Sequence, residues 1–266
     1  MSFLPAHLVE GAPDAPRVAF VLHGILGSAR NWRTFARELA RRHPAWRLVL
    51  VDLRNHGDSH GAPPPHTVEA CAADLAALAA HLGLRPEAVV GHSFGGKVAL
   101  AYARAPGAGL RTVWVLDAVP GPVDLEDGEV DRVVAGLRAI PMPVARRNDV
   151  HEALRAQGFS DAISAWMTTN LTPAPGGYAW RFDLDAIAEM LSSYERLDLW
   201  PWLRQTHLDV RIVRAERSDR WTPNELAPFE TAPPNVKLVP LANAGHWVHV
   251  DNPEGLQALL ADTFRA

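Results

Sequence analysis

The chain has 266 residues, of which 48% are hydrophobic and 21% are charged. That length and apolar content fit one large α/β domain with a sizeable core better than two small domains. The formal net charge is -4, with acidic and basic residues interspersed, so neither nucleic acid nor an anionic membrane surface is an expected partner.

The sequence gives no signal for export or membrane insertion. The first residues, MSFLPAHLVEGAP, lack both a basic start and a long apolar run. No later segment reaches the roughly 18 consecutive apolar residues of a membrane span. We therefore expect a cytoplasmic protein without a membrane span. The single cysteine, Cys71, cannot form an internal disulfide, and its place on an apolar helical stripe predicts a packing role.

The first part of the chain alternates between strand and helix patterns. Short apolar runs predict strands at 3–9, 17–22 and 47–51, the first of them at a sheet edge. Apolar residues at helical spacing predict a helix that follows Trp32 and another at 67–82. Such alternation is typical of a parallel sheet with right-handed crossover connections.

The stretch 89–102, VVGHSFGGKVALAY, joins a short apolar run to a helix pattern through one tight turn. Gly91, Ser93 and Gly95 stand at the G-x-S-x-G spacing, which is typical of a nucleophilic serine on a strained strand-to-helix elbow. The helix that follows would direct free N–H groups and its positive dipole end toward the same place. Because strand, elbow and helix patterns occur in the required order, a glycine-rich turn without chemistry is the weaker interpretation.

The character of the chain changes after the apolar run at 112–116, which ends at Asp117. Between 118 and 200 no strand pattern is convincing, but several amphipathic stretches indicate helices that are broken by prolines. These stretches lie at 129–140, 150–157, 161–169 and 184–195. Aromatic side chains give this region large apolar surfaces, so a cap that covers a substrate is a better interpretation than a solvated spacer. They are Trp166, Tyr178, Trp180, Trp200 and Trp202.

The alternation of strands and helices resumes after this insertion. Apolar runs at 210–214 and 236–240 predict two more strands, and 253–264 predicts a last helix with an asparagine as its N-terminal cap. We therefore expect 1–117 and 201–266 to form a single core, from which the segment between them projects as a helical cap that is not an independent domain.

A serine hydroxyl becomes a good nucleophile only when a base removes its proton. His246, in NAGHWVHVDNP, follows the last predicted strand, where parallel strand ends meet the elbow, and it comes after the serine and the acid in the chain. A metal site at His246 and His249 is disfavoured, because H-x-x-H here lacks a helix, a neighbouring glutamate and further ligands. The other histidines near these motifs are interpreted as supports of loops and turns: His23, His56, His60 and His92.

Four motifs occur in order along the chain: HGILGS, DLRNHGDS, GHSFGGKVAL and AGHWVHVDNPE. Through them the chain resembles the α/β-hydrolase superfamily, and in particular the small bacterial acyl esterases of the YbfF type and their mitochondrial abhydrolase relatives. The resemblance implies an α/β-hydrolase fold, a mostly parallel sheet flanked by helices with a helical cap inserted after the strand ending near Asp117. It also implies that the backbone N–H groups of Ile25 and Phe94 form the oxyanion hole.

The acid of the triad is where the sequence departs from the commonest superfamily pattern. Most members place an aspartate after the strand that here ends at Arg214, where this chain has Ser218 followed by Asp219. The esterases that the chain resembles take the acid from the preceding strand end, which is Asp117. The resemblance favours Asp117, keeps Asp219 as the alternative and makes Ser218 an auxiliary hydrogen-bond partner of His246. A surface ion pair is the non-catalytic interpretation of either aspartate.

These residues predict a cofactor-free and metal-free serine hydrolase that cleaves small-molecule carboxylic esters, of short to medium uncharged acyl chains, through an acyl-enzyme. Thioesterase, lactonase and carbon–carbon bond hydrolase activities use the same groups and stay open. A small-molecule receptor that keeps the triad without turnover is the alternative from another class, because a fold does not establish a function. The sequence leaves the oligomeric state open.

Overall fold

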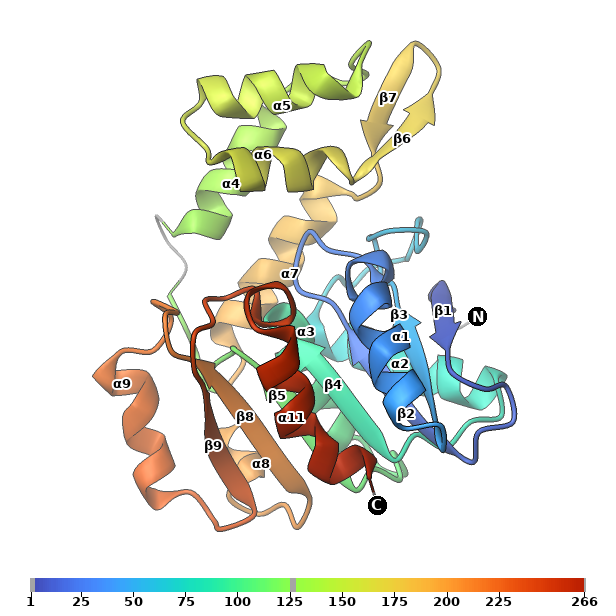
Figure 1. Ribbon diagram of the computed structural model, residues 1–266. Coiled ribbons are helices and arrows are strands. Elements are labelled where there is room, and N and C mark those ends of the chain that lie inside the picture. The colour runs from blue at the N-terminus through green and yellow to red at the C-terminus, as the bar shows by residue number, and fades with distance from the viewer. Residues whose placement is uncertain (1–2, 125–127, 266) are drawn as a thin grey trace.

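A seven-stranded sheet lies at the centre of the computed structural model, which describes residues 3–124 and 128–265 (Figure 1). The strand order is β1-β3-β2-β4-β5-β8-β9, in which β1 runs antiparallel to β3 and the other neighbours pair in parallel. The strands are β1 (His7–Glu10), β2 (Arg17–Leu22), β3 (Trp46–Val51), β4 (Ala88–His92), β5 (Thr112–Leu116), β8 (Asp209–Ala215) and β9 (Val236–Leu241). Parallel pairing brings the carboxyl ends of these strands, and the loops that follow them, to one edge of the sheet.

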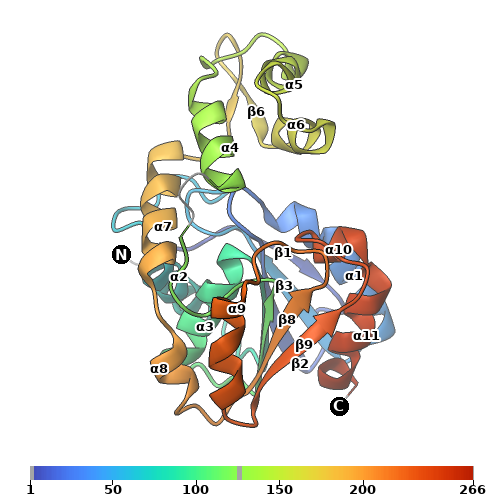
Figure 2. The same ribbon diagram turned by 90° about the vertical axis from the view of Figure 1, so that its left-hand side faces the viewer.

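Helices cover both faces of this sheet (Figure 2). One face carries α1 (Arg33–Arg42), α10 (Val248–Asp251) and α11 (Pro253–Phe264), and the other carries α2 (Val68–His81), α3 (Phe94–Arg104) and α8 (Trp200–Leu203). Successive strand residues enter opposite apolar layers, as Phe20 and Val21 of β2 do. The central strands β2, β3, β4 and β5 are mostly apolar runs, because both of their faces are buried. The predicted mostly parallel sheet flanked by helices is confirmed.

The edge strand is shorter than the sequence predicted. It was expected at 3–9 and is found at His7–Glu10. Pro5 has no N–H to donate to a neighbouring strand, and the N–H of Ala6 donates to Ser59 Oγ at 2.8 Å. The chain therefore joins the sheet only after these two residues.

Two smaller features of the core, the cap of the last helix and the packing of the cysteine, agree with the sequence. Asn252 caps α11, because its side-chain oxygen accepts the N–H of Gly255 at 2.9 Å. Cys71 is buried on α2, and burial raises the pKa of its thiol, so it packs rather than reacts. Among the helices in the described ranges, none has both the length and the apolar character needed to cross a membrane.

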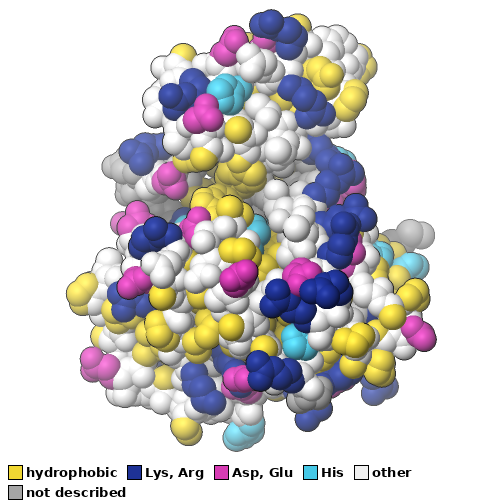
Figure 3. Space-filling model, viewed as in Figure 1, with side chains coloured by type: hydrophobic (Ala, Val, Ile, Leu, Met, Phe, Trp, Pro, Cys, Tyr) yellow, Lys and Arg dark blue, Asp and Glu magenta, His cyan; other side chains and the backbone are white. Residues whose placement is uncertain are grey.

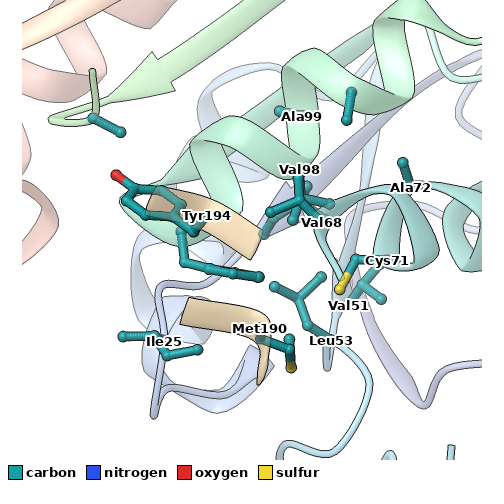
Figure 4. Packing of buried hydrophobic residues seen from close by; sticks show 14 of the residues in the cluster. Ile25, Val51, Leu53, Val68, Cys71, Ala72, Val98, Ala99, Met190 and Tyr194 are labelled. Carbon is teal, nitrogen blue, oxygen red and sulfur yellow. The ribbon is translucent and has the colours of Figure 1, made fainter. Parts of the chain in front are cut away.

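The insertion between β5 and β8 rises above the carboxyl edge of the sheet (Figure 1). The four predicted amphipathic stretches form helices with slightly different bounds. They are α4 (Glu129–Arg138), α5 (Arg147–Ala156), α6 (Asp161–Thr168) and α7 (Leu184–Arg196). The last of these returns toward the core, and Figure 4 shows its Met190 and Tyr194 in one apolar cluster with Ile25, Leu53 and Val98 of the core.

The expectation that the insertion contains no strand is wrong. Residues Leu171–Ala174 (β6) and Gly177–Trp180 (β7) pair antiparallel as a hairpin. Pro175 and Gly176 form its two-residue connection, and Gly176 has a φ of 86°, which suits the second central position of a Pro-Gly turn. Two strands of four residues, one containing a proline, are too short to give a clear alternating pattern in the sequence.

A buried lysine ties both stems of the insertion to α3. Lys97 is fully buried, and its ammonium donates to the carbonyls of Gly121 at 2.6 Å, Tyr194 at 2.6 Å and Leu197 at 3.1 Å. Gly121 belongs to the chain leaving β5, and the other two carbonyls lie at the end of α7. The two stems also bond to each other, because Val123 N–H donates to the carbonyl of Glu195 at 3.0 Å.

Burial lowers the pKa of Lys97 to about 7, although the carboxylates of Asp198 and Glu195 oppose this shift. An unfolded lysine keeps a pKa near 10.5, so the unfolded chain holds one more proton than the folded chain between these two values. Stability contributed at this site should therefore rise as the pH increases from about 7 toward about 10, and fall as the pH decreases toward 7.

Comparison with Lys97→Met tests this dependence. We expect the free energy of unfolding of the wild type, minus that of Lys97→Met, to grow by about 2 kcal/mol between about pH 7.5 and pH 9.5, because each pH unit contributes up to about 1.4 kcal/mol. Urea unfolding at the two pH values measures it. Lys237→Met, which replaces the exposed lysine of β9, is the matched control for the change from lysine to methionine. A flat difference for Lys97 would show that burial does not lower its pKa.

Candidate active site

Ser93 stands alone between the end of β4 and the start of α3. Its φ of 52° and ψ of -120° are strained for a residue with a side chain. The glycines on either side make the turn possible: a Cβ on Gly91 would lie 2.1 Å from the carbonyl oxygen of Gly95, and one on Gly95 would lie 2.5 Å from that of His23. The N–H of Ser93 donates to the carbonyl of Leu116 at 2.9 Å, which anchors the elbow to β5.

The loop between β9 and α10 places His246 against this serine. His246 Nε2 lies 3.0 Å from Ser93 Oγ, and His246 Nδ1 lies 2.8 Å from Asp117 Oδ2. A carboxylate only accepts hydrogen bonds, so Nδ1 carries the proton and Nε2 is free to accept from the hydroxyl. The structure thus brings together three residues that are far apart in the sequence.

The carboxylate of Asp117 is completely buried and receives four hydrogen bonds. Oδ2 accepts from His246 Nδ1 and, at 2.7 Å, from Ser218 Oγ. Oδ1 accepts from Trp221 Nε1 at 2.7 Å and from Ala215 N–H at 3.1 Å. Burial opposes ionisation of this carboxyl, but the hydrogen bonds and the nearby imidazole outweigh burial and lower its pKa. Asp117 is therefore held as a carboxylate.

Two predictions about the loop after β8 can be compared with this arrangement. Ser218 was expected to bond to His246, and instead its hydroxyl donates to Asp117, because the imidazole already uses Nδ1 on the same carboxylate. Asp219 is exposed, and in the described part of the chain it has no hydrogen bond or ion pair with His246. Trp221 was missed, since the sequence does not signal which distant indole will reach a buried carboxylate.

The pKa of His246 lies below its ordinary value of 6.5. Burial is the largest cause and the positive charge of Arg220 is the next, while the hydrogen bond and charge of Asp117 act in the opposite direction. His92 supports the histidine loop, because its Nε2 donates to the carbonyl of His246 at 2.7 Å. The imidazole of His246 is thus neutral and available as a base at neutral pH.

Two buried histidines support the loop that follows β2. His23 accepts the N–H of Leu53 on Nε2 at 2.9 Å, and His56 accepts the N–H of Leu26 on Nε2 at 3.1 Å. Burial lowers the pKa of His23 to about 4 and that of His56 to about 3, so both rings stay neutral. Their expected structural role is confirmed, although His56 is a buried support rather than a simple turn residue.

The predicted oxyanion donors lie on the two segments that flank Ser93. Ile25 follows Gly24, whose backbone passes so close to the serine that an added Cβ would lie 3.2 Å from Ser93 Cβ. Phe94 is the first residue of α3, where the helix itself offers no acceptor for the N–H. Within residues 3–124 and 128–265, neither of these two N–H groups donates to another protein atom.

The side chains of Ser93 and His246 line a pocket between the core and the insertion. The insertion contributes mainly apolar side chains, and the space-filling view shows a recess beneath it with hydrophobic walls (Figure 3). The lining residues outside the elbow and histidine loops are Gly24, Ile25, Leu26, Glu129, Val130, Val133, Ile163, Trp166 and Arg220. The insertion side of the pocket is therefore mainly apolar, with Glu129 as its charged residue, and Arg220 is the charged residue on the core side.

The described residues contain no group of three or more histidine, cysteine or carboxylate side chains arranged to hold a metal ion. His249, the second histidine of H-x-x-H, stacks on Trp32 with 4.0 Å between ring centroids. Its ring is used in packing rather than directed into the pocket.

Comparison with known proteins shows which family this chain resembles. Residues 19–259 match the model of the alpha/beta hydrolase family. The chain is 29% identical to the mouse sn-1-specific diacylglycerol lipase ABHD11, over 94% of this chain and 81% of that protein. It is 31% identical to lipase LipV of Mycobacterium tuberculosis, over 79% and 78%, and 24% identical to esterase YbfF of Escherichia coli, over 89% and 88%.

A solved structure of a marine microorganism esterase superposes on this chain with a TM-score of 0.85 at 24% identity, covering 98% of this chain and 99% of the esterase. At this identity the superposition supports the fold alone. The family model, in contrast, matches nearly the whole chain, from residue 19 to residue 259. The chain therefore belongs to the α/β-hydrolase family.

Proposed function

We propose that the protein is a cofactor-free serine hydrolase that cleaves carboxylic esters through an acyl-enzyme. The hydrogen-bonded series from Ser93 through His246 to Asp117, at 3.0 and 2.8 Å, is the observation that carries this proposal. It provides a nucleophile, a base and a group that orients the base, in the arrangement needed to activate a hydroxyl. The relatives named above are esterases and lipases, which supports an ester substrate.

In the first half of the reaction, Ser93 Oγ attacks the ester carbonyl carbon while His246 Nε2 takes the hydroxyl proton. The carbonyl oxygen becomes an oxyanion, which accepts hydrogen bonds from the N–H groups of Ile25 and Phe94. The bond from carbon to the alcohol oxygen then breaks, and His246 donates its proton to that oxygen. The alcohol leaves and the acyl group stays on Ser93.

In the second half, His246 removes a proton from water, and the hydroxide attacks the acyl carbon. The same two N–H groups stabilise the second oxyanion, and Ser93 regains its proton from His246 as the carboxylic acid leaves. Asp117 stabilises the imidazolium in both halves and is not itself protonated. Each oxyanion donor typically contributes about 10²- to 10³-fold to the rate.

We further propose that the insertion, at 118–200, acts as a cap over the substrate. Its Val130, Val133, Ile163 and Trp166 line the catalytic pocket, which suits an uncharged acyl chain of short to medium length. Thioester, lactone and carbon–carbon bond substrates would use the same catalytic groups and are the alternatives that an activity panel compares.

Replacement of the nucleophile is the first test. Ser93→Ala should abolish turnover of p-nitrophenyl esters and reaction with a fluorophosphonate probe, because both need the hydroxyl. It should leave the urea unfolding midpoint nearly unchanged, since a single hydroxyl contributes little packing. If the wild type resists the probe and cleaves no ester, thioester or lactone, the protein is a binding protein and the proposal is wrong.

The acyl group can be tested with p-nitrophenyl esters of increasing chain length. We expect kcat/KM to be highest for short to medium chains, because the apolar wall of the pocket is of limited extent. An ester whose acyl chain ends in a carboxylate should react more slowly than its neutral analogue of equal length. Faster reaction of the charged acyl ester would contradict an apolar acyl site.

The role of the acid is tested by a pair of matched substitutions. Asp117→Asn should keep the fold but lower kcat by about 10⁴-fold, because an amide no longer favours the reactive tautomer of His246. Asp219→Asn should change kcat little. Ser218→Ala removes one of four hydrogen bonds on the carboxylate and should cost about tenfold or less. The reverse order of effects for the two aspartates would assign the acid to Asp219.

The pH dependence of kcat/KM should follow His246. Only the neutral imidazole accepts the proton of Ser93, and the pKa of His246 is lowered from 6.5. Activity should therefore persist as the pH falls through 6.5 and decline only at lower pH. Steady-state rates on a neutral ester measure this acidic limb, and a limb centred at or above pH 6.5 would show that the histidine is not in the environment described.

A further inference from the structure

The catalytic pocket contains a positive charge that the reaction above does not use. Arg220 lines the pocket together with Ser93 and His246 and is only partly exposed. Within the described residues its guanidinium makes no hydrogen bond and no ion pair. The fold does pair another sheltered guanidinium, that of Arg54, which bonds to both carboxylate oxygens of Asp74 at 2.7 and 2.8 Å.

The position of Arg220 is fixed by its neighbours in the loop after β8. Ser218 and Trp221 both donate to the buried carboxylate of Asp117, each at 2.7 Å. These two bonds hold the loop on either side of Arg220. Because the same carboxylate holds His246, the arginine is held on the histidine side of the pocket.

This placement has a cost for catalysis. The charge of Arg220 lowers the pKa of His246, which disfavours the imidazolium that forms when Ser93 is deprotonated. An anion bound to Arg220 would cancel this effect, and it would do so only when a substrate that carries the anion is present. A cation in such a place is thus favourable for an anionic substrate and unfavourable for a neutral one.

The reaction geometry indicates which part of the substrate carries the anion. The leaving alcohol must lie beside His246, because Nε2 donates a proton to its oxygen. The apolar wall from α4 and α6, which includes Val130 and Trp166, belongs to the insertion and suits the acyl chain. The anionic group that Arg220 would bind therefore belongs to the alcohol part of the substrate, within a few bonds of the ester oxygen.

We propose that Arg220 forms an anion subsite for the leaving group, so that the preferred substrates are esters of neutral acyl chains with alcohols that carry a carboxylate or phosphate near the ester oxygen. This inference rests on the proposed ester hydrolase and adds a substrate class to it. A guanidinium can bind either anion through two parallel hydrogen bonds. Glu129, on the insertion side of the same pocket, acts in the opposite direction by repelling an anion.

Three butyryl esters test the subsite, and they differ only in the alcohol: 3-hydroxypropanoate, its neutral amide, and 2-hydroxyethyl phosphate. For the wild type we expect kcat/KM to be about tenfold higher for the carboxylate ester than for the amide, the scale of one charge-assisted hydrogen bond. The phosphate ester, compared with the carboxylate ester, identifies which anion the site prefers. p-Nitrophenyl butyrate measures ester hydrolysis without a charged alcohol.

Arg220→Gln should reduce the carboxylate-to-amide ratio to about one, and Arg220→Lys should restore part of it. Glu129→Gln should raise the ratio, because it removes the repelling charge.

Arg217→Gln is the matched control: this exposed arginine of the same loop bonds to the carbonyl of Asn243 outside the pocket, and the ratio should not change. Arg220→Gln should also move the acidic limb of kcat/KM for p-nitrophenyl butyrate to higher pH, which a purely structural role would not do.

The inference is overturned if the wild type cleaves p-nitrophenyl butyrate but prefers neither anionic ester over the amide, or if Arg220→Gln keeps the preference. It is also overturned if a monosuccinyl ester, whose anion lies on the acyl chain, reacts faster than the butyryl ester of the same alcohol and loses this advantage in Arg220→Gln. In these outcomes the ester hydrolase stands. If the wild type cleaves no ester at all, the proposed function itself fails.

Discussion

The site is organised around one buried charge. The carboxylate of Asp117 has no exposed surface, and a buried carboxylate is strongly unfavourable unless its oxygens are hydrogen-bonded. Its four donors come from the end of β8, from two residues of the following loop and from the loop after β9. Satisfying this charge therefore fixes two loops at once, and the loop that carries His246 is one of them.

Backbone strain accompanies this arrangement. Ser93 and Asp117 both have positive φ values, 52° and 51°, a region that costs a residue with a side chain of order 1 kcal/mol or more. They are the first residues after β4 and β5, which are neighbours in the sheet and pair in register from Ala88 to His92. The paired strands end at the same level of the carboxyl edge of the sheet. Ser93 and Asp117 therefore lie side by side, and both contact His246.

Sequence reasoning succeeded where the signal is local. The elbow at Ser93 follows from glycines that the turn needs, and His246 follows from its place after the last strand. Asp117 came from a resemblance and not from the residues alone, since two aspartates fitted the chain order. The contact of Ser218 and the presence of Trp221 depend on residues about a hundred positions away, and no local pattern encodes such a contact.

The same limit applies to the insertion and to the histidines. Four-residue strands such as β6 are too short to show a clear alternation of apolar and polar residues, so the sequence did not predict the hairpin. His23, His56 and His246 are all sheltered from solvent, but only His246 faces both a carboxylate and a hydroxyl. The role of each imidazole is set by its hydrogen-bond partners, which the fold supplies and the sequence does not state.

The insertion is connected to the nucleophile as well as placed over it. Phe94, whose N–H is the proposed oxyanion donor after the serine, stacks its ring on Tyr194 of α7 at 5.7 Å. The ammonium of Lys97, one turn further along α3, lies 4.3 Å from the same ring and bonds to the backbone of both stems. A shift of α7 would therefore disturb the packing behind the elbow, so the position of the insertion and the geometry of the oxyanion donor depend on each other.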